Sequence, residues 1–139
     1  MLIQERYRNE PWKLLVACVL LNITSRQQVD KVIDELFERF PNPVRMEAAT
    51  DEEIGEIIRP CGLWRRRAGT LRRLSGQWSR IKLGWPFEDP PEQEVCRIHG
   101  VGLYALDSYR FFVLGDTSRF ESGDKELAKW LLEDDVALD

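Results

Sequence analysis

The sequence predicts an all-α protein built from many short helices. Apolar residues recur at three- and four-residue spacing along most of the chain, and cap residues, glycines and prolines interrupt that spacing at short intervals. No segment shows the alternating pattern of a strand. The chain has 139 residues, of which 43% are hydrophobic, and this is enough to bury a core. We therefore expect one domain over residues 1–139.

The first half of the chain predicts four helices. Pro11 occupies a favourable first helical position, and the apolar run behind it predicts a core helix up to an interruption at 22–25. Ser25 is expected to cap a second helix, which reaches Phe40. Two further helices are expected over 46–49 and from Thr50 to Ile58, the latter opened by a capping box with Glu53.

The second half predicts one long helix and three shorter ones. Residues 63–81 follow a turn at Pro60 and Gly62 and form the long, basic helix. A loop with three prolines covers 85–91. The remaining segments are a helical hairpin at about 92–114, made of helices over 92–98 and 103–114, then a connection over 115–123, and a last helix over 124–132.

Charge is divided unevenly along the chain. The net charge is -4, yet residues 59–82 contain eight basic residues and no acidic one. One basic face on an acidic protein is typical of a specific DNA-contacting surface. On charge alone, an ordinary solvated helix face explains the same pattern. If the face does bind DNA, binding should depend strongly on salt.

Cysteine and histidine usage argues against a metal centre. The three cysteines are far apart, form no CxxC pair and are accompanied by a single histidine, so neither a zinc nor an iron–sulfur site is expected. We expect the thiols to be reduced and buried, which is typical of an intracellular protein. No apolar run approaches the roughly 20 residues of a membrane span and no signal peptide is evident, so no membrane partner is expected.

The segment His99-Gly100-Val101-Gly102 predicts a tight turn between two helices. Glycine permits positive φ and a close approach of the backbone to a neighbour. The helix that follows has free N–H groups at its start, and these can hold a phosphate without any basic side chain. An ordinary helix–helix turn explains the same residues.

Four segments, taken together, resemble the helix-hairpin-helix DNA glycosylase superfamily that includes endonuclease III. They occur in the family's order, at similar spacing, across almost the whole chain. Within that superfamily they are most similar to the thymine and uracil mismatch glycosylases that also carry a methyl-CpG-binding domain. The segments are Pro11-Trp12-Lys13-Leu14-Leu15 with Leu21-Asn22-Ile23-Thr24-Ser25, Pro60-Cys61-Gly62-Leu63 with Arg67-Ala68, His99-Gly100-Val101-Gly102 with Asp107-Ser108-Tyr109-Arg110, and Asp124-Lys125-Glu126-Leu127.

The resemblance implies a base-excision enzyme with a compact multi-helix fold. Such an enzyme flips a nucleotide out of the duplex and hydrolyses its N-glycosidic bond. Asp124 matches the family's catalytic acid, which stabilises the positive sugar and helps to activate water. It is also a good N-cap. Tyr104 stands where members with lyase activity carry a lysine, and tyrosine cannot form a Schiff base, so the resemblance implies a monofunctional enzyme.

The resemblance also implies a set of DNA contacts. Leu63 matches a residue that wedges into the duplex. Ile23 stands where relatives carry a polar residue that fills the gap left by the flipped base. An isoleucine can insert between bases but cannot hydrogen-bond the orphaned base, which argues against strict recognition of guanine. The full set of expected DNA contacts is His99, Gly100, Val101, Gly102, Ile23, Leu63, Asn22, Thr24, Arg65 and Lys125.

The function expected from these residues is excision of uracil, thymine or a 5-substituted pyrimidine, mispaired with guanine, by a monomer. The partner is double-stranded DNA with a damaged or mispaired base. No cofactor is expected, although family analogy allows a monovalent cation at the hairpin. Three alternatives stay open: a non-catalytic DNA-binding module, a glycosylase-like fold that processes modified thymine, and a helical protein–protein module.

Overall fold

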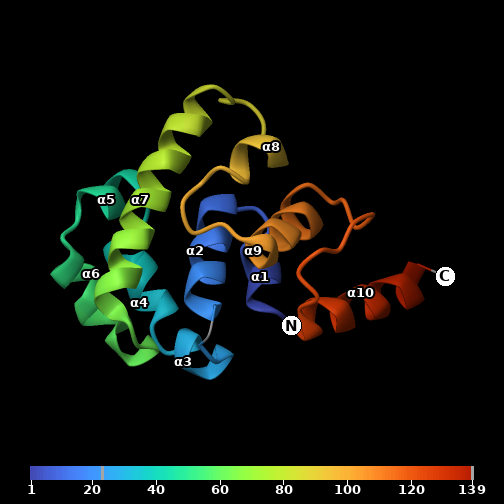
Figure 1. The fold of residues 1–139 in the computed structure, drawn as a ribbon, viewed down its shortest axis with the longest axis horizontal. Helices are drawn as coiled ribbons and strands as arrows, with labels where there is room; N and C mark the ends of the chain where they lie inside the picture. Colours follow the sequence, from blue (N-terminus) through green and yellow to red (C-terminus); the bar gives the residue numbers. More distant parts are fainter. Residues whose placement is uncertain (23, 139) are drawn as a thin grey trace.

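The computed structural model describes residues 1–22 and 24–138, with side chains described as far as Glu133. Every regular element in that part of the chain is helical, which confirms the predicted all-α class (Figure 1). The elements are α1 (Ile3–Arg6), α2 (Pro11–Leu21), α3 (Arg26–Asp30), α4 (Ile33–Arg39), α5 (Pro43–Ala48), α6 (Asp51–Ile58), a 3₁₀ turn η1 (Arg59–Cys61), α7 (Trp64–Leu83), α8 (Glu92–Val95), α9 (Leu103–Ser108), a π turn η2 (Tyr109–Val113) and α10 (Lys125–Leu138).

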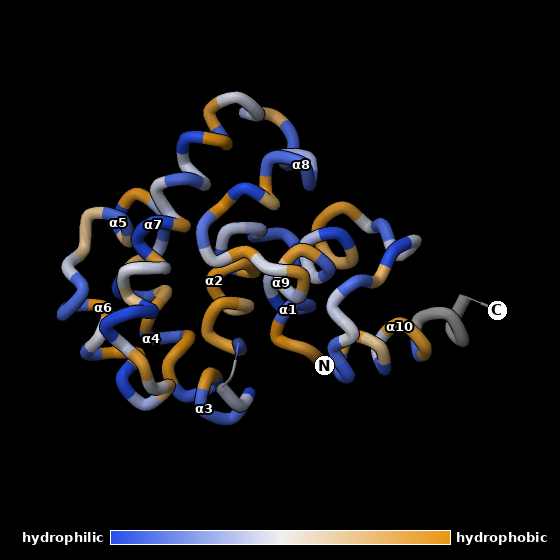
Figure 2. Tube along the Cα trace, viewed as in Figure 1, coloured by the Kyte–Doolittle hydropathy of each residue, from blue (hydrophilic) through white to orange (hydrophobic). Residues whose placement is uncertain are grey.

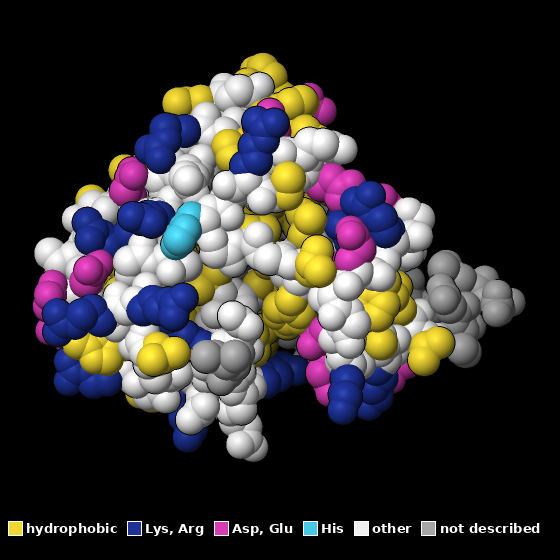
Figure 3. Space-filling model, viewed as in Figure 1, with side chains coloured by type: hydrophobic (Ala, Val, Ile, Leu, Met, Phe, Trp, Pro, Cys, Tyr) yellow, Lys and Arg dark blue, Asp and Glu magenta, His cyan; other side chains and the backbone are white. Residues whose placement is uncertain are grey.

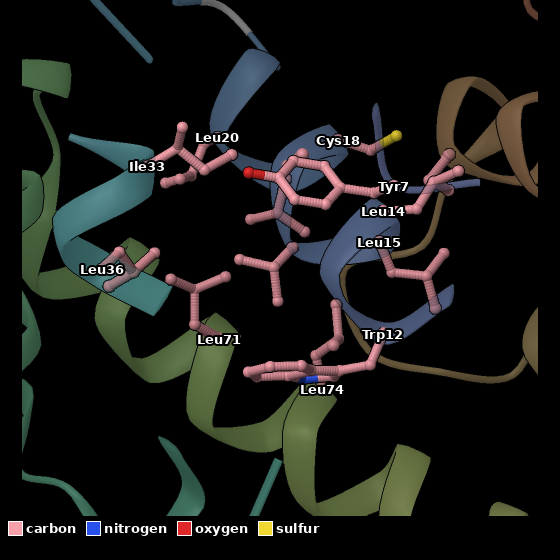
Figure 4. Close-up of a cluster of buried hydrophobic side chains, with 14 of the residues drawn as sticks. Tyr7, Trp12, Leu14, Leu15, Cys18, Leu20, Ile33, Leu36, Leu71 and Leu74 are labelled. Carbon is pink, nitrogen blue, oxygen red and sulfur yellow. The ribbon is translucent and has the colours of Figure 1, made fainter. Parts of the chain in front are cut away.

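Helix α2 lies at the centre of the molecule and is apolar nearly all round (Figure 2). It packs against α1, α3, α7 and α9, so its side chains are buried on every side. Leu14, Leu15 and Leu20 are fully buried in the cluster shown in Figure 4. The indole N–H of Trp12 donates to Ser75 Oγ at 3.0 Å, which ties α2 to the long helix α7.

The predicted caps in the first half are confirmed, but one helix is divided. Ser25 accepts the backbone N–H of Gln28, and Thr50 forms its capping box with Glu53. The helix expected from Ser25 to Phe40 is interrupted, because the N–H of Val32 donates to the carbonyl of Val29 at 3.0 Å and tightens the chain to a three-residue turn. Helices α3 and α4 result.

The hairpin is more irregular than its pattern indicates. Its first helix ends at Val95, three residues before the predicted end, and the chain continues in turns to the glycines. Its second helix widens into the π turn η2, in which the N–H of Leu114 donates to the carbonyl of Tyr109 at 3.1 Å. The last helix then begins at Lys125, directly after Asp124 as predicted, and extends to Leu138.

Candidate active site

The turn before α7 presents an exposed apolar side chain on a strained backbone. Gly62 has φ +78° and Leu63 has φ +47°, and Leu63 is the one non-glycine residue with positive φ in the described part of the chain. A left-handed conformation costs a residue with a Cβ about 1–2 kcal/mol. Leu63 is nevertheless 59% exposed, so burial does not offset that cost. A strained backbone at an exposed leucine is typical of a site where the side chain contacts a ligand.

A buried arginine joins this turn to the end of α2. The guanidinium of Arg67 donates to the carbonyl of Leu20 at 3.1 Å, to the Thr24 hydroxyl at 2.6 Å and to the carbonyl of Asn22. The hydroxyl of Thr24 in turn donates to the carbonyl of Cys61 at 3.1 Å. Burial lowers the pKa of Arg67. Arg67 and Thr24 therefore support both loops from inside the protein.

This arrangement changes the expectation for Thr24. The side chain expected to contact DNA is buried, and its hydroxyl is engaged within the protein. Asn22, by contrast, is exposed. Ile23, expected at the flipping site, lies outside the described residues.

The glycine turn of the hairpin packs directly on α7. Gly100 has φ +89°, and a Cβ placed on it would lie 2.6 Å from Thr70 Cγ2, so both its conformation and its surroundings require glycine. The backbone N–H of His99 donates to Gln77 Oε1 at 2.6 Å. Gly102 then begins α9, whose first N–H groups have no partner inside the helix. The turn thus has the geometry expected of a phosphate-binding hairpin.

Tyr104 and Asp124 line the same pocket, of about 360 Å³, between the end of α2 and the start of α10. A neighbouring pocket of about 280 Å³ shares Tyr104, Asn22 and Ser122 and reaches the hairpin glycines. Figure 3 shows this face hollowed between the α7 side and the α10 side, with hydrophobic side chains at the bottom of the hollow. The structure therefore brings the predicted acid and the predicted pocket tyrosine together.

One oxygen of Asp124 is used in capping. Its Oδ2 accepts the backbone N–H of Leu127 at 2.9 Å, which makes it the N-cap of α10. In the described part of the chain, no hydrogen bond reaches Oδ1, and the side chain is only half-buried. Capping therefore fixes the carboxylate while leaving one oxygen available at the pocket.

Tyr104 is held as a neutral phenol. Burial raises the pKa of Tyr104, and the nearby thiol of Cys18 and carboxylate of Asp124 raise it further. The side-chain amide of Gln4 donates to the phenolic oxygen at 2.6 Å, so the phenolic hydrogen is directed elsewhere. Gln4 was missed in the sequence because it lies 100 residues from Tyr104 along the chain.

A buried ionic cluster positions the loop that precedes Asp124. Asp107 is fully buried, and its carboxylate accepts the backbone N–H groups of Glu121 at 3.0 Å and Ser122 at 2.7 Å. It also pairs with Arg110, which is 1% exposed and bridges to Glu92 at 3.1 Å. No local sequence signal indicates this cluster, because the pattern shows only polar residues within a helix.

A groove of about 580 Å³ gathers several of the expected DNA contacts. Its walls include Leu63, Asn22, Arg65, His99 and Gly100. The guanidinium of Arg65 lies over the ring of Trp64, 4.8 Å from its centroid. Lys125 is exposed at the start of α10 and does not line this groove.

The described part of the chain shows neither a metal-binding cluster nor a membrane-spanning helix. Within the residues that the structure describes, no three His, Cys, Asp or Glu side chains are grouped so as to hold a metal ion. None of the described helices is both long enough and apolar enough to span a membrane. The monovalent cation expected at the hairpin stays a prediction.

Comparison with known proteins identifies the family. Residues 16–118 match the model of the HhH-GPD superfamily base excision DNA repair proteins. The matched segment contains the hairpin and Tyr104 and ends before Asp124. A methyl-CpG-binding domain protein 4-like protein of Arabidopsis thaliana is 35% identical over 91% of this chain and 26% of its own length. A thymine-DNA glycosylase of Aeropyrum pernix is 41% identical over 68% of this chain and 42% of its own length. The chain thus spans less than half the length of these relatives.

Solved structures agree with the fold. A thermostable thymine-DNA glycosylase superposes with a TM-score of 0.69 at 22% identity, over 83% of this chain and 53% of that one. An endonuclease III trapped as a covalent intermediate with DNA superposes with a TM-score of 0.66 at 28% identity, over 76% of this chain and 48% of that one. The family model covers well over half of the 139 residues, and the chain therefore belongs to the HhH-GPD superfamily of base excision DNA repair proteins.

Proposed function

We propose that the protein is a monofunctional DNA glycosylase that excises uracil or thymine, including thymine mispaired with guanine, from double-stranded DNA. The observation that carries the proposal is the single pocket lined by the Tyr104 phenol and the Asp124 carboxylate. Asn22 lines both this pocket and the groove that carries Leu63. The name of the thymine-DNA glycosylase of Aeropyrum pernix supports the choice of thymine. A thymine/uracil-DNA glycosylase of Pyrobaculum aerophilum, which is 37% identical over 72% of this chain and 43% of its own length, supports uracil as well.

The residues suit hydrolysis of a glycosidic bond. As the C1′–N bond breaks, its electron pair leaves with the base and the sugar gains oxocarbenium character. A carboxylate fixed beside the sugar stabilises it more strongly as that positive charge develops. The free Oδ1 of Asp124 fits this role and can also accept a proton from the water that bonds to C1′. The product is a free base and an abasic sugar.

Tyr104 supports a reaction without strand cleavage. A lyase step needs an amine that attacks C1′ and forms a Schiff base, and a phenol cannot form one. Because its pKa is raised, Tyr104 stays protonated near neutral pH. With Gln4 donating to its oxygen, the phenol is free to donate its hydrogen towards the pocket. We assign it to orienting the flipped nucleotide.

The test is a single-turnover assay on labelled duplexes with G·U, G·T, A·U or 5-hydroxymethyluracil pairs, with and without alkali. We expect strand breaks only after alkali, and no covalent adduct on borohydride treatment. Asp124→Asn should lose excision while it still folds, because asparagine caps a helix as well as aspartate does. The matched control is Asp34→Asn, which removes an exposed carboxylate far from the pocket.

Two outcomes separate this function from its alternative. Asp124 is fully explained as a helix cap if the protein only binds DNA. In that case no duplex would be cleaved after alkali, although all would be bound, and Asp124→Asn would bind like the parent protein. Excision that Asp124→Asn retains would also contradict the role given to Asp124.

A further inference from the structure

Helix α7 carries a regular series of polar side chains on the face that meets the hairpin. Arg66, Thr70, Arg73 and Gln77 are spaced alternately by four and three residues, which places them on one side of the helix. Thr70 lies against Gly100, and Gln77 accepts the N–H of His99. The two arginines are therefore next to the hairpin turn, about 10 Å apart along the helix axis.

The arginines of this region differ in what they already bind. Arg67 is buried, Arg72 pairs with Asp51 at 2.9 Å, and Arg80 pairs with Glu47 at 3.7 Å. Within the described part of the chain, no ion pair engages Arg66 or Arg73, and both are exposed beside the groove that holds Leu63 and His99. Gln77, four residues after Arg73, lines a smaller pocket of about 200 Å³ together with Arg97 of the hairpin. Arg97 is exposed and forms no ion pair with the described residues.

We propose that Arg66, Arg73 and Arg97 form a phosphate-binding track. This track holds the backbone of duplex DNA along the surface that runs from the Gly62–Leu63 turn to the hairpin. Figure 3 shows Lys and Arg side chains gathered around the single histidine on this face. Three exposed cations that form no ion pair with the described residues fit a polyanion. Glu94 is the acidic group that also lines the pocket at the Arg97 end. The inference deepens the proposed function by naming the cations that position its substrate.

The track lies beside the base pocket. The groove lined by Arg66 and Arg73 shares Asn22 and Gly100 with the pocket of about 280 Å³ that adjoins Tyr104. A strand held by Arg66 and Arg73 would pass Leu63 and His99, which line the same groove. The track should therefore contribute to affinity for any duplex, damaged or not, and leave the reacting atoms untouched.

The test measures affinity apart from catalysis. The Kd for an undamaged duplex is measured at several KCl concentrations for the parent protein, Arg66→Gln/Arg73→Gln and Arg97→Gln. Each lost phosphate contact should lower the slope of log K against log [KCl] by about 1 and, near 0.1 M salt, weaken binding about tenfold. The control is Arg39→Gln/Arg45→Gln, which removes two exposed positive charges from α4 and α5.

The outcomes separate the track from the proposed enzyme activity. The proposal stands if the track variants lose affinity and slope while the control does not, even if no base is excised. It is overturned if the Arg66/Arg73 variant and the control change affinity and slope alike. For an active enzyme, the track variants should need more protein to reach half of their maximal single-turnover rate, whereas the control variant should not. A reduced rate at unchanged affinity would also overturn the track.

Discussion

Asp107 Oδ2 accepts the backbone N–H of Ser122 at 2.7 Å, and Ser122 Oγ in turn accepts the backbone N–H of Asp124 at 3.2 Å. Two hydrogen bonds thus connect a fully buried carboxylate in α9 to Asp124, the N-cap of α10. Asp107 does not line the pocket, but it holds Ser122, which does. We therefore expect the placement of Asp124 to depend on Asp107.

Asp107→Asn should lower the excision rate without weakening DNA binding. The amide replaces one acceptor oxygen with a donor, which then faces backbone N–H groups or Arg110. We expect a loss of about 2–3 kcal/mol in unfolding free energy, because the buried Arg110 loses the one fully buried carboxylate among its partners and a donor is placed among other donors. The single-turnover rate should fall about tenfold or more as Asp124 shifts. Urea unfolding and saturating single-turnover assays measure the two effects.

The surface variant Asp51→Asn is the control, because it removes a carboxylate that pairs with Arg72 at a half-exposed position. If Asp107→Asn excised bases at the parent rate, the loop would not need Asp107 to place Asp124.

Tyr104→Phe should separate orientation of the nucleotide from the stability of the fold. The ring remains, but the pocket loses its phenolic donor and Gln4 loses an acceptor. A single lost hydrogen bond of this kind contributes about 0.5–1.5 kcal/mol, so we expect roughly a tenfold slower excision step. The products should still break only in alkali. A rate equal to that of the parent would show that the hydroxyl does not act on the substrate.

The sequence predicted the elements whose signals are local. Ser25 and the Thr50–Glu53 box mark helix starts within four residues, and the apolar run of α2 marks the core. The class of fold and the approach of Tyr104 and Asp124 to one pocket also agree with the residues that carry the resemblance.

The sequence failed where partners are distant. Gln4 meets Tyr104 across 100 residues, and Arg67 reaches Leu20 across 47. Neither contact produces a periodic pattern in the sequence. A run of basic residues also does not show which arginine is buried and which is exposed. The π turn after α9 likewise accompanies contacts that no local pattern shows: Arg110 pairs with the buried Asp107, and the N–H of Asp116 donates to the carbonyl of Arg110 at 2.8 Å.

Leu63→Ala and Leu63→Gly should affect activity alike and stability differently. Both remove the exposed side chain expected to enter the duplex, so both should excise more slowly. Only glycine relieves the left-handed strain at φ +47°. We expect Leu63→Gly to raise the unfolding free energy by a net amount of about 1 kcal/mol, because the greater backbone entropy of glycine in the unfolded chain offsets part of the gain. Alanine should leave stability within about 0.5 kcal/mol of the parent.

Thermal unfolding and single-turnover excision of the two variants provide the comparison. If alanine excised at the parent rate, Leu63 would not act as a wedge. If glycine did not stabilise the protein relative to alanine, the turn would not be strained at Leu63.

Arg67→Met should destabilise the protein by about 3 kcal/mol or more. The guanidinium donates to three backbone carbonyls and to Thr24, and its loss removes the donor that reaches the buried carbonyl of Leu20 and the buried hydroxyl of Thr24. Arg65→Met, on the same turn of α7 but exposed, should change stability by less than about 0.5 kcal/mol. Chemical denaturation of both variants tests the difference. Equal, small effects would contradict the internal role of Arg67.

The buried thiol of Cys18 should make the protein less stable at alkaline pH. Burial raises the pKa of Cys18 from its ordinary value of 9.0 to about 12. Below pH 9 the thiol is protonated in both the folded and the unfolded chain, so its contribution to stability is intact. As the pH rises from 9 towards 12, the unfolded chain releases this proton first and folding loses up to about 1.4 kcal/mol per pH unit.

Cys18→Ala removes this dependence, whatever the substitution costs in packing at neutral pH. Between pH 8 and pH 10, urea unfolding should show the parent losing about 1 kcal/mol more than Cys18→Ala, because both proteins share every other titrating group. Cys96→Ala, at an exposed cysteine, should lose as much as the parent does. If the parent and Cys18→Ala lost the same amount, the thiol of Cys18 would ionise as readily in the folded protein as in the unfolded chain, and burial would not raise its pKa.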